Sequence, residues 1–245
     1  MNAVGIIVEY NPLHKGHIYH IEETKKMFSG RPLVVLINGY FLERGEVSIL
    51  SKENKTMLSL IYGADLVVEL PFIFGSQSAD IFADASIKIL KNLGVSDIVF
   101  GSEANNIELL EKVVEIQDSK DYNLKVKELL TKGINYPTAL AQALDIQEDI
   151  FNPNDLLGIS YIKAIRKNKA NIKAHTIKRT SKYHDLESNE EIISASNIRN
   201  KIKNGEDIST FVPRKVIKCL ENINMDDLFS FIKYKIITDN NLEKY

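Results

Sequence analysis

The sequence predicts an α/β fold in which a parallel β-sheet carries helices on both faces. Over the first hundred residues, short apolar runs without a helical period alternate with segments of helical pattern. This alternation is typical of consecutive βαβ units, whose strands lie parallel in one sheet. The chain has 245 residues, of which 44% are hydrophobic and 26% charged. These proportions exclude disordered, collagen-like and disulfide-framework proteins and indicate one large domain, alone or with a small appendage.

Four apolar runs are the first expected strands. They are Ala3–Val8, Leu33–Ile37, Leu66–Leu70 and Asp97–Phe100, and helices over about 16–27, 52–62 and 78–93 separate them. Asn11-Pro12 forms a turn after the first strand, and Pro71 ends the third. Asp65 and Glu69 belong to a run that we expect to be buried, so both need polar partners. Ligands of such a sheet bind outside the carboxyl ends of its strands.

The rest of the chain is predicted to be mainly helical. The expected helices cover about 107–144 with a turn at Gly133, then about 155–167, about 196–204, and the residues past Pro213. One further strand is expected at Ile172–Ile177. Ser194 or Ser196 can cap the helix that follows it.

The overall charge hides a basic segment. The formal net charge is -2, whereas residues 163–218 hold 14 Lys and Arg against 6 Asp and Glu, a local net charge of +8. Such a segment suits a phosphate-rich partner, and solvated helix faces would give the same pattern.

No segment carries a signal for export or membrane insertion. No stretch approaches the roughly 18 consecutive apolar residues of a membrane helix, and Met1–Glu9 lacks a basic region and a cleavage site. The single cysteine, Cys219, lies in an apolar helical stretch, which favours a place in the core. We therefore expect a cytoplasmic protein with no membrane partner. The sequence carries no indication of oligomeric state.

The most informative motif is Asn11–His17, placed where the first strand gives way to the first helix. A nucleotide bound at the carboxyl ends of the strands has its phosphates at such a helix start, where free N–H groups favour anions. Gly16 allows close backbone approach. His14 and His17 can donate hydrogen bonds to phosphate oxygens and stabilise the charge that develops during displacement at phosphorus.

A metal site is the alternative interpretation of these histidines. On one helix, however, His14 and His20 would point apart, and no Cys or carboxylate cluster nearby completes a zinc site. We predict no metal ligands in the protein. Taken alone, His20 is most simply an inert surface residue.

A second motif, Ile193–Arg199, begins a helix inside the basic segment. The hydroxyls of Ser194 and Ser196, with Arg199 one turn further on, can hold the β- and γ-phosphates of a nucleotide. Taken alone, a Ser-x-Ser pair before a helix is usually only a cap.

The two motifs together resemble the HxGH nucleotidyltransferase superfamily, which has a Rossmann-like fold. Further matches resemble the tRNA(Met) cytidine acetate ligase family. These matches are Gly5–Pro12, Gly39–Glu46, Gly63–Pro71, Gly101–Glu103, Asn152–Gly158 and Ser194–Arg199. The resemblance implies that the chain makes acetyl-adenylate from acetate and ATP and passes the acetyl group to N4 of the wobble cytidine of elongator tRNA(Met).

The same resemblance implies a set of site residues. Catalytic roles fall to His14, His17 and Arg199. Nucleotide contacts fall to Ile7, Val8, Glu9, Tyr10, Asn11, Pro12, Leu13, His14, Lys15, Gly16, His17, Ile18, Tyr19, His20, Gly101, Asn154, Arg179, Ser194 and Ser196. Mg²⁺ is expected with the nucleotide. Three of these residues also have simpler interpretations: Gly101 as a turn glycine, Asn154 as a helix cap and Arg179 as a solvated charge.

The resemblance also gives a domain organisation. It implies a nucleotidyltransferase-like catalytic domain over 1–220, with a helical insertion at about 106–168, and the beginning of a helical C-terminal region over 221–245. Members of the family continue beyond the position of Tyr245, so we expect a shortened form that adenylates acetate but lacks part of the tRNA-binding surface.

The sequence departs from the family pattern at one position, and it leaves alternatives for two residues and for the function. The family usually has Gln where this chain has Glu43. Arg44 and Lys52 can hold a carboxylate or phosphate, or serve in ion pairs only. A small-molecule adenylyltransferase of the same superfamily, of the pantetheine-phosphate or nicotinamide mononucleotide type, and a noncatalytic RNA-binding module on a nucleotide fold are the competing functions.

Overall fold

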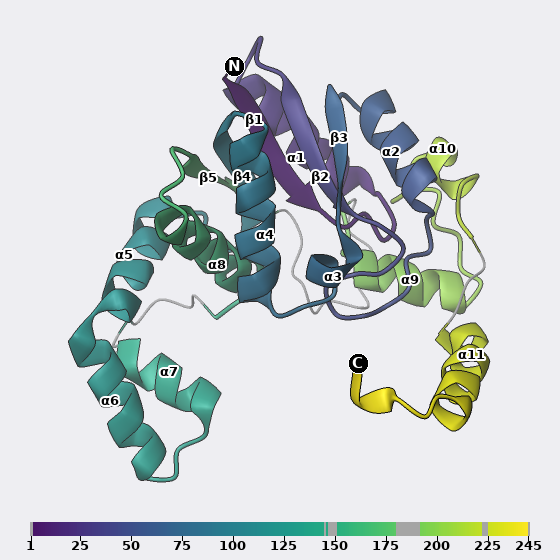
Figure 1. Ribbon diagram of the computed structural model, residues 1–245. Helices are drawn as coiled ribbons and strands as arrows, with labels where there is room; N and C mark the ends of the chain where they lie inside the picture. The colour runs from purple at the N-terminus through teal and green to yellow at the C-terminus, as the bar shows by residue number, and fades with distance from the viewer. Residues whose placement is uncertain (1, 145, 147–150, 180–191, 222–224, 245) are drawn as a thin grey trace.

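Five parallel strands form one sheet at the centre of the molecule (Figure 1). The computed structural model describes residues 2–144, 146, 151–179, 192–221 and 225–244. The strands are β1 (Ala3–Val8), β2 (Leu33–Asn38), β3 (Leu66–Leu70), β4 (Val95–Ser102) and β5 (Lys173–Lys178), in the order β3-β2-β1-β4-β5. All four neighbouring pairs are parallel, as expected of βαβ units. The predicted α/β fold is confirmed, with strand boundaries within two residues.

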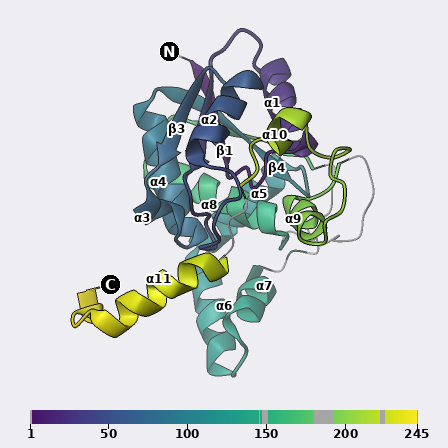
Figure 2. The same cartoon turned by 90° about the vertical axis from the view of Figure 1, so that its right-hand side faces the viewer.

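Helices cover both faces of the sheet (Figures 1 and 2). One face packs against α1 (Lys15–Met27), α2 (Lys52–Ile61), α9 (Ala195–Lys203) and α10 (Arg214–Ile217), and the other packs against α4 (Ala79–Asn92), α5 (Ile107–Asp118) and α8 (Pro153–Lys167). Successive strand residues face opposite sides, so Val4 and Ile6 join the first core while Ala3 and Ile7 contact the second. Two apolar layers therefore hold the sheet between the helices.

The expectation that Leu66–Leu70 is buried holds for Leu70 but is wrong for the rest of the run, because β3 is the edge of the sheet. Leu66 is 44% exposed. Asp65 accepts a hydrogen bond from Leu33 N at 2.8 Å, and Glu69 pairs with Lys52 at 2.9 Å between Nζ and Oε2. The two acids thus find partners at an open edge. Lys52 is engaged in this ion pair and does not line the cavity described below.

The helical segment between β4 and β5 has two parts. The helices α6 (Lys120–Thr131) and α7 (Tyr136–Leu144) pack on each other and project away from the sheet, whereas α8 packs on α4 and β4. The part of the predicted insertion that α8 forms is therefore a layer of the sheet domain. A short helix, α3 (Phe72–Gly75), follows β3.

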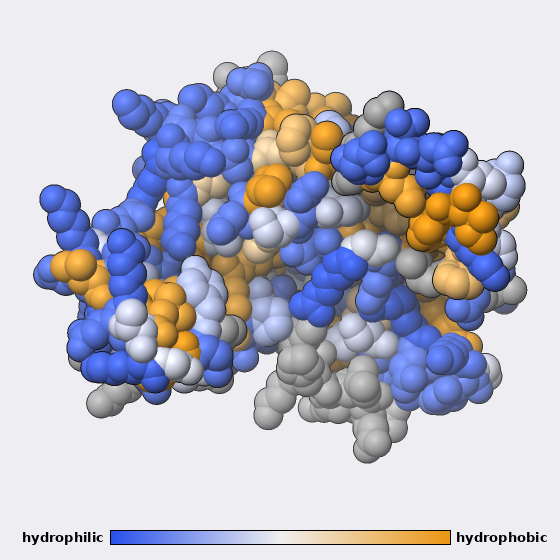
Figure 3. Space-filling view, turned by 60° about the horizontal axis from the view of Figure 1, so that its bottom comes forward, coloured by the Kyte–Doolittle hydropathy of each residue, from blue (hydrophilic) through white to orange (hydrophobic). Residues whose placement is uncertain are grey.

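The last described residues form α11 (Met225–Thr238) and a short 3₁₀ helix, η1 (Leu242–Lys244). Several large apolar side chains of α11 are exposed, among them Phe231 and Ile237. Figure 3 looks onto the end of the molecule where the strands terminate and shows apolar patches among hydrophilic residues. In the part of the chain that the structure describes, no helix is long and apolar enough to cross a membrane.

Candidate active site

A cavity of about 610 Å³ lies at the carboxyl edge of the sheet. Its lining comes from the ends of β1 and β4, the first turns of α1, α8 and α9, and the loop after β2. Three helices thus direct their N-termini at one space, where their unpaired N–H groups favour anions. This is the place at which the parallel topology predicts a ligand.

The end of β1 turns sharply into α1. Tyr10 has φ of 51°, a left-handed conformation that is costly for a residue with a Cβ. Its buried ring packs against the ring of His17 in an edge-to-face arrangement, with 4.8 Å between ring centroids. Asn11 Oδ1 accepts a hydrogen bond from Ile49 N at 2.8 Å, which ties this turn to the loop after β2. These contacts hold the turn in a conformation that presents the following histidines to the cavity.

His14 and His17 cap α1 with their side chains. His14 Nδ1 accepts from Gly16 N at 3.0 Å, and His17 Nδ1 accepts from His14 N at 3.3 Å. A backbone N–H can only donate, so both Nδ1 atoms lack a proton and each neutral ring carries its proton on Nε2. The rings lie 3.9 Å apart between centroids. Each ring therefore has a donor Nε2–H on the side opposite the backbone.

Burial keeps these histidines neutral. It lowers the pKa of His14 to about 3, helped by the positive charge of Arg179. The pKa of His17 also falls well below its usual value, chiefly through burial and then through His14, His20 and Arg179. At neutral pH both are hydrogen-bond donors through Nε2 without a net charge.

His20 is a third histidine of the cavity and not the inert surface residue of the simplest interpretation. Its Nε2 donates to the carbonyl of Val99 at 3.1 Å. Burial lowers its pKa to about 4. Among the described residues no group of three or more His, Cys, Asp or Glu is placed to hold a metal ion.

The structure gives a further reason for glycine at position 16, which could not be predicted from the sequence. A Cβ there would lie 2.8 Å from His14 Cε1 and 3.2 Å from Ile192 Cγ2. The glycine makes room for the ring of His14, not only for a ligand.

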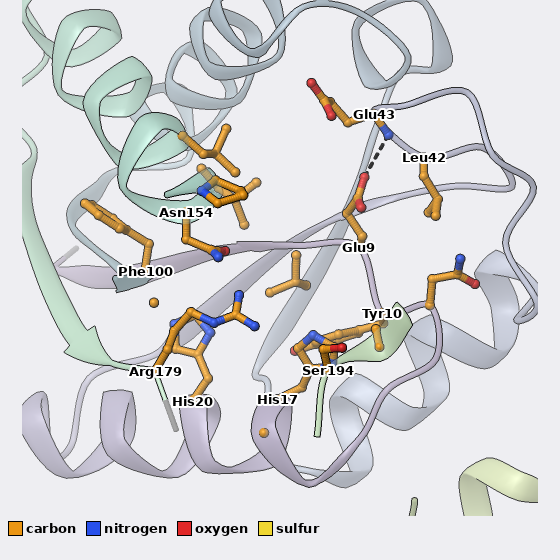
Figure 4. Close-up of a pocket in the computed structure, with 18 of the residues that line it drawn as sticks. Glu9, Tyr10, His17, His20, Leu42, Glu43, Phe100, Asn154, Arg179 and Ser194 are labelled. Carbon is orange, nitrogen blue, oxygen red and sulfur yellow. Dashed lines mark hydrogen bonds between the residues drawn. The ribbon is translucent and has the colours of Figure 1, made fainter. Parts of the chain in front are cut away.

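The β4 side of the cavity brings together three predicted residues. Arg179 follows β5, and its Cγ would lie 3.2 Å from a Cβ at Gly101. Asn154 Nδ2 donates to Glu103 Oε1 at 2.6 Å, and Arg179 Nε lies 3.9 Å from the same oxygen. Asn152 occupies the N-cap of α8, so Asn154 is not the cap. Figure 4 shows Asn154, Phe100, Arg179 and His20 grouped at one end of the cavity.

The second motif reaches the site through α9. Ser194 Oγ accepts from Asn197 N at 3.2 Å and caps the helix, whereas Ser196 lies in its first turn. Arg199 donates to Asn11 O at 2.9 Å and to Glu46 Oε2 at 3.1 Å. Its guanidinium thereby links α9 to the turn after β1 and to the loop after β2.

Residues 7–20, predicted to contact the nucleotide, lie partly in the cavity wall and partly in the core. The lining includes Ile7, Val8, Glu9, Tyr10, Asn11, His14, Gly16, His17, Tyr19 and His20, but not Pro12, Leu13, Lys15 or Ile18. Leu13 and Ile18 belong to the core beneath α1. Arg44 lines the cavity as well.

A polar network behind the cavity escaped the sequence reasoning. Lys55 is fully buried, and its Nζ donates to the carbonyls of Asn38 at 3.1 Å and Gly39 at 2.8 Å. Burial lowers the pKa of Lys55 to about 8, opposed by the charges of Glu9 and Glu69. Asn38 Nδ2 in turn donates to Glu9 Oε1 at 3.0 Å. The only sequence signal is that Lys55 stands one turn before Leu58 on the apolar face of α2.

Comparison with known proteins places this chain in a family. A family model described as HIGH Nucleotidyl Transferase matches residues 1–245. A tRNA(Met) cytidine acetate ligase of Mycoplasma mobile is 38% identical over 98% of this chain and 81% of its own length. The chain belongs to the tRNA(Met) cytidine acetate ligase family of HIGH nucleotidyltransferases. The tRNA(Met) cytidine acetate ligase of Clostridium novyi is 39% identical over 98% of this chain and 66% of its own length.

Solved structures of the family share the fold. The crystal structure of Thermotoga maritima TmcAL in its apo form superposes with a TM-score of 0.87 at 31% identity, over 94% of this chain and 62% of that one. A second form bound with alpha-thio ATP gives a TM-score of 0.76 at 29% identity, over 94% of this chain and 56% of that one. The chain thus spans about two thirds of the length of most family members that it matches here.

Proposed function

We propose that this chain forms acetyl-adenylate from acetate and ATP and then transfers the acetyl group to N4 of the wobble cytidine of elongator tRNA(Met). The observation that carries the proposal is the pair of capping histidines, His14 and His17. Both present a neutral Nε2–H donor in a cavity at the start of α1. Membership of the tRNA(Met) cytidine acetate ligase family, and the alpha-thio ATP bound by a relative, support ATP and acetate as substrates.

In the first step an acetate oxygen attacks the α-phosphorus of ATP and pyrophosphate leaves. Negative charge accumulates on the oxygens of the transferring phosphoryl group. Donors that already point at these oxygens lower the barrier without reorganisation, which is why neutral histidines fixed by their own backbone suit this role. The N-termini of α1 and α9 add to the favourable potential.

The phosphates beyond the α-position need cationic partners. Arg199 would exchange its contact with exposed Glu46 for the β- and γ-phosphates, and Arg179 also lines the cavity and is a second candidate cation for them. We propose that Mg²⁺ enters as part of the MgATP substrate, carried by the phosphates themselves. Asn154 and the ring of Phe100 lie beside Arg179 and are the candidate contacts for the base and ribose.

Exposed cations at the cavity and along α9 and α10 suit an RNA partner. Lys178 lines the cavity, and Lys203, Arg214, Lys215 and Lys218 are exposed on and after α9. Phosphate contacts of this kind supply most of the affinity for a nucleic acid and weaken with salt. We therefore propose that the tRNA approaches over this side of the molecule.

Two assays test the proposed function. Acetate-dependent exchange of pyrophosphate into ATP reports the first step, and mass analysis of nucleosides from treated tRNA reports N4-acetylcytidine. Exchange that needs acetate is expected. Exchange that instead needs pantetheine phosphate or nicotinamide mononucleotide would refute the proposal in favour of a small-molecule adenylyltransferase, and ATP binding without any exchange would favour a noncatalytic module.

A further inference from the structure

Arg179 and two acidic side chains lie at different ends of the cavity. Figure 4 shows Arg179 at one end, beside His20 and Asn154, and the carboxylates of Glu9 and Glu43 at the other, with His17 between them. ATP, as an anion, suits the end that holds Arg179. At the other end Arg44 also lines the cavity, with 3.9 Å between its Nε and Glu43 Oε2, and the carboxylate oxygens there suit a ligand that offers N–H groups. The proposed function has one such ligand, the exocyclic amine of the acceptor cytosine, which is a hydrogen-bond donor.

Glu9 is held so that one oxygen is occupied and the other is open. Oε1 accepts from Glu43 N at 2.7 Å and from Asn38 Nδ2 at 3.0 Å. In the part of the chain that the structure describes, Oε2 accepts no hydrogen bond and is not among the buried unpartnered atoms. Because Glu9 lines the cavity, Oε2 is its acceptor on that side.

The support behind Glu9 is rigid. Asn38 also donates to the carbonyl of Gly75 at 3.2 Å, and buried Lys55 donates to the carbonyl of Asn38. These bonds fix the carboxylate from behind and leave its free oxygen in one position. A fixed acceptor of this kind is what proton transfer from a bound substrate requires.

We propose that Glu9 is the general base of the second step, the transfer of the acetyl group to cytosine N4. Its Oε2 accepts a hydrogen bond from N4 of the target cytosine and takes the proton that N4 loses as it attacks the acetyl carbonyl. The new C–N bond forms as the bond from the acetyl carbon to the AMP oxygen breaks, and AMP leaves with the electron pair. Glu9 then returns the proton to solvent. This assignment rests on the proposed function, which leaves the base of that step unassigned.

Other groups of the cavity suit the role less well. His14 and His17 have lowered pKa values, and their Nδ1 lone pairs are occupied by backbone N–H groups. Burial instead raises the pKa of Glu9 above its usual value, so its carboxylate is a better proton acceptor than an exposed one. Glu43 contributes its backbone N–H to Glu9, and its side chain lies 3.9 Å from Arg44 Nε.

The test supplies chemically made acetyl-adenylate and cytidine nucleoside, which bypasses the first step and needs no tRNA-binding surface. Acetate-dependent pyrophosphate exchange is measured on the same preparations. Glu9→Gln keeps an oxygen for Asn38 and Glu43 N but replaces the acceptor Oε2 by a donor. We expect the ratio of cytidine acetylation to exchange to fall roughly 100-fold, the lower end of the usual effect of a general base.

Glu43→Gln is the matched control, because it removes the same charge from the same end of the cavity without touching Oε2. Its ratio should stay near that of the unaltered chain. Equal loss of both rates in Glu9→Gln, or an equal fall of the ratio in Glu43→Gln, would overturn the assignment, as would no acetylation of cytidine above the uncatalysed rate. If the unaltered chain shows transfer but no exchange, the first step of the proposed function is refuted, and a transfer rate that falls roughly 100-fold in Glu9→Gln but not in Glu43→Gln still supports Glu9.

Discussion

Replacing Gly16 by alanine places a methyl group against the histidine that caps α1. The added Cβ would lie 2.8 Å from His14 Cε1 and 3.0 Å from His14 Nδ1. Carbon atoms prefer separations of about 3.5 Å or more, so the ring must move by about 0.7 Å. The methyl also meets Ile192, so the ring of His14 relieves the contact by shifting toward the cavity that it lines, away from its place in the cap.

The expected effect on stability is small because two contributions oppose each other. Moving the ring weakens the 3.0 Å bond from Gly16 N to His14 Nδ1, and losing a cap costs about 1 kcal/mol. Alanine in place of glycine within a helix returns about 0.5–1 kcal/mol. The effect on catalysis is one-sided, because a misplacement of about 1 Å in a reacting site can cost 10²-fold.

The assay is acetate-dependent pyrophosphate exchange beside denaturant unfolding. For Gly16→Ala we expect exchange to fall about 100-fold while the free energy of unfolding changes by less than about 1 kcal/mol. Gly30→Ala is the control with the opposite pattern. Gly30 has φ of 77° and no atom within 4 Å of an added Cβ, so backbone strain should cost about 1–2 kcal/mol of stability with exchange unchanged. Exchange in Gly16→Ala within a fewfold of the unaltered chain would refute the role given to His14.

Three further outcomes follow from the site. His17→Ala should lower exchange by roughly 10²- to 10³-fold through loss of one donor; near-normal exchange would remove that role. Arg199→Ala should weaken ATP binding far more than AMP binding in calorimetry, and equal losses would place Arg199 away from the β- and γ-phosphates. Lys55 has a pKa of about 8, against about 10.4 when unfolded, so the unfolded chain binds more protons between these values. Its contribution to stability should therefore rise with pH from about 8 to 10.4. The difference in unfolding free energy between the unaltered chain and Lys55→Met should grow over this range, and a flat difference would contradict the assignment.

The sequence predicts the sheet well because its signals are local. The apolar runs of β1, β2 and β4 each show their strand without reference to the rest of the chain. The edge position of β3 is not local, because it depends on which strands pair. The same run of residues 66–70 would be buried in the middle of a sheet and is half open at its edge.

The candidate site divides in the same way. His14 and His17 lie within one turn of each other, so their pattern is visible in the sequence and their meeting in space follows from a helix start. The contact of Arg199 with Asn11 joins residues 188 positions apart, and that of Lys55 with Asn38 is made between the helix α2 and the end of β2. Charge and residue type alone give no sign of such partners.

The histidines show why local geometry changes the chemistry inferred from a motif. The spacing of His14 and His17 alone is compatible with donors, metal ligands or a charged pair. Once each Nδ1 accepts a backbone N–H, the ring can neither bind a metal through that atom nor act as a base there. Burial then removes the charge, which leaves Nε2–H as the one function open to both rings at neutral pH. Two neutral donors suit a phosphoryl group whose negative charge grows during the reaction. Both histidine rings keep the same protonation state when the product leaves. A proton acceptor for the second step must therefore come from another residue of the cavity, and among the described residues that line it Glu9 has a fixed position and an open oxygen.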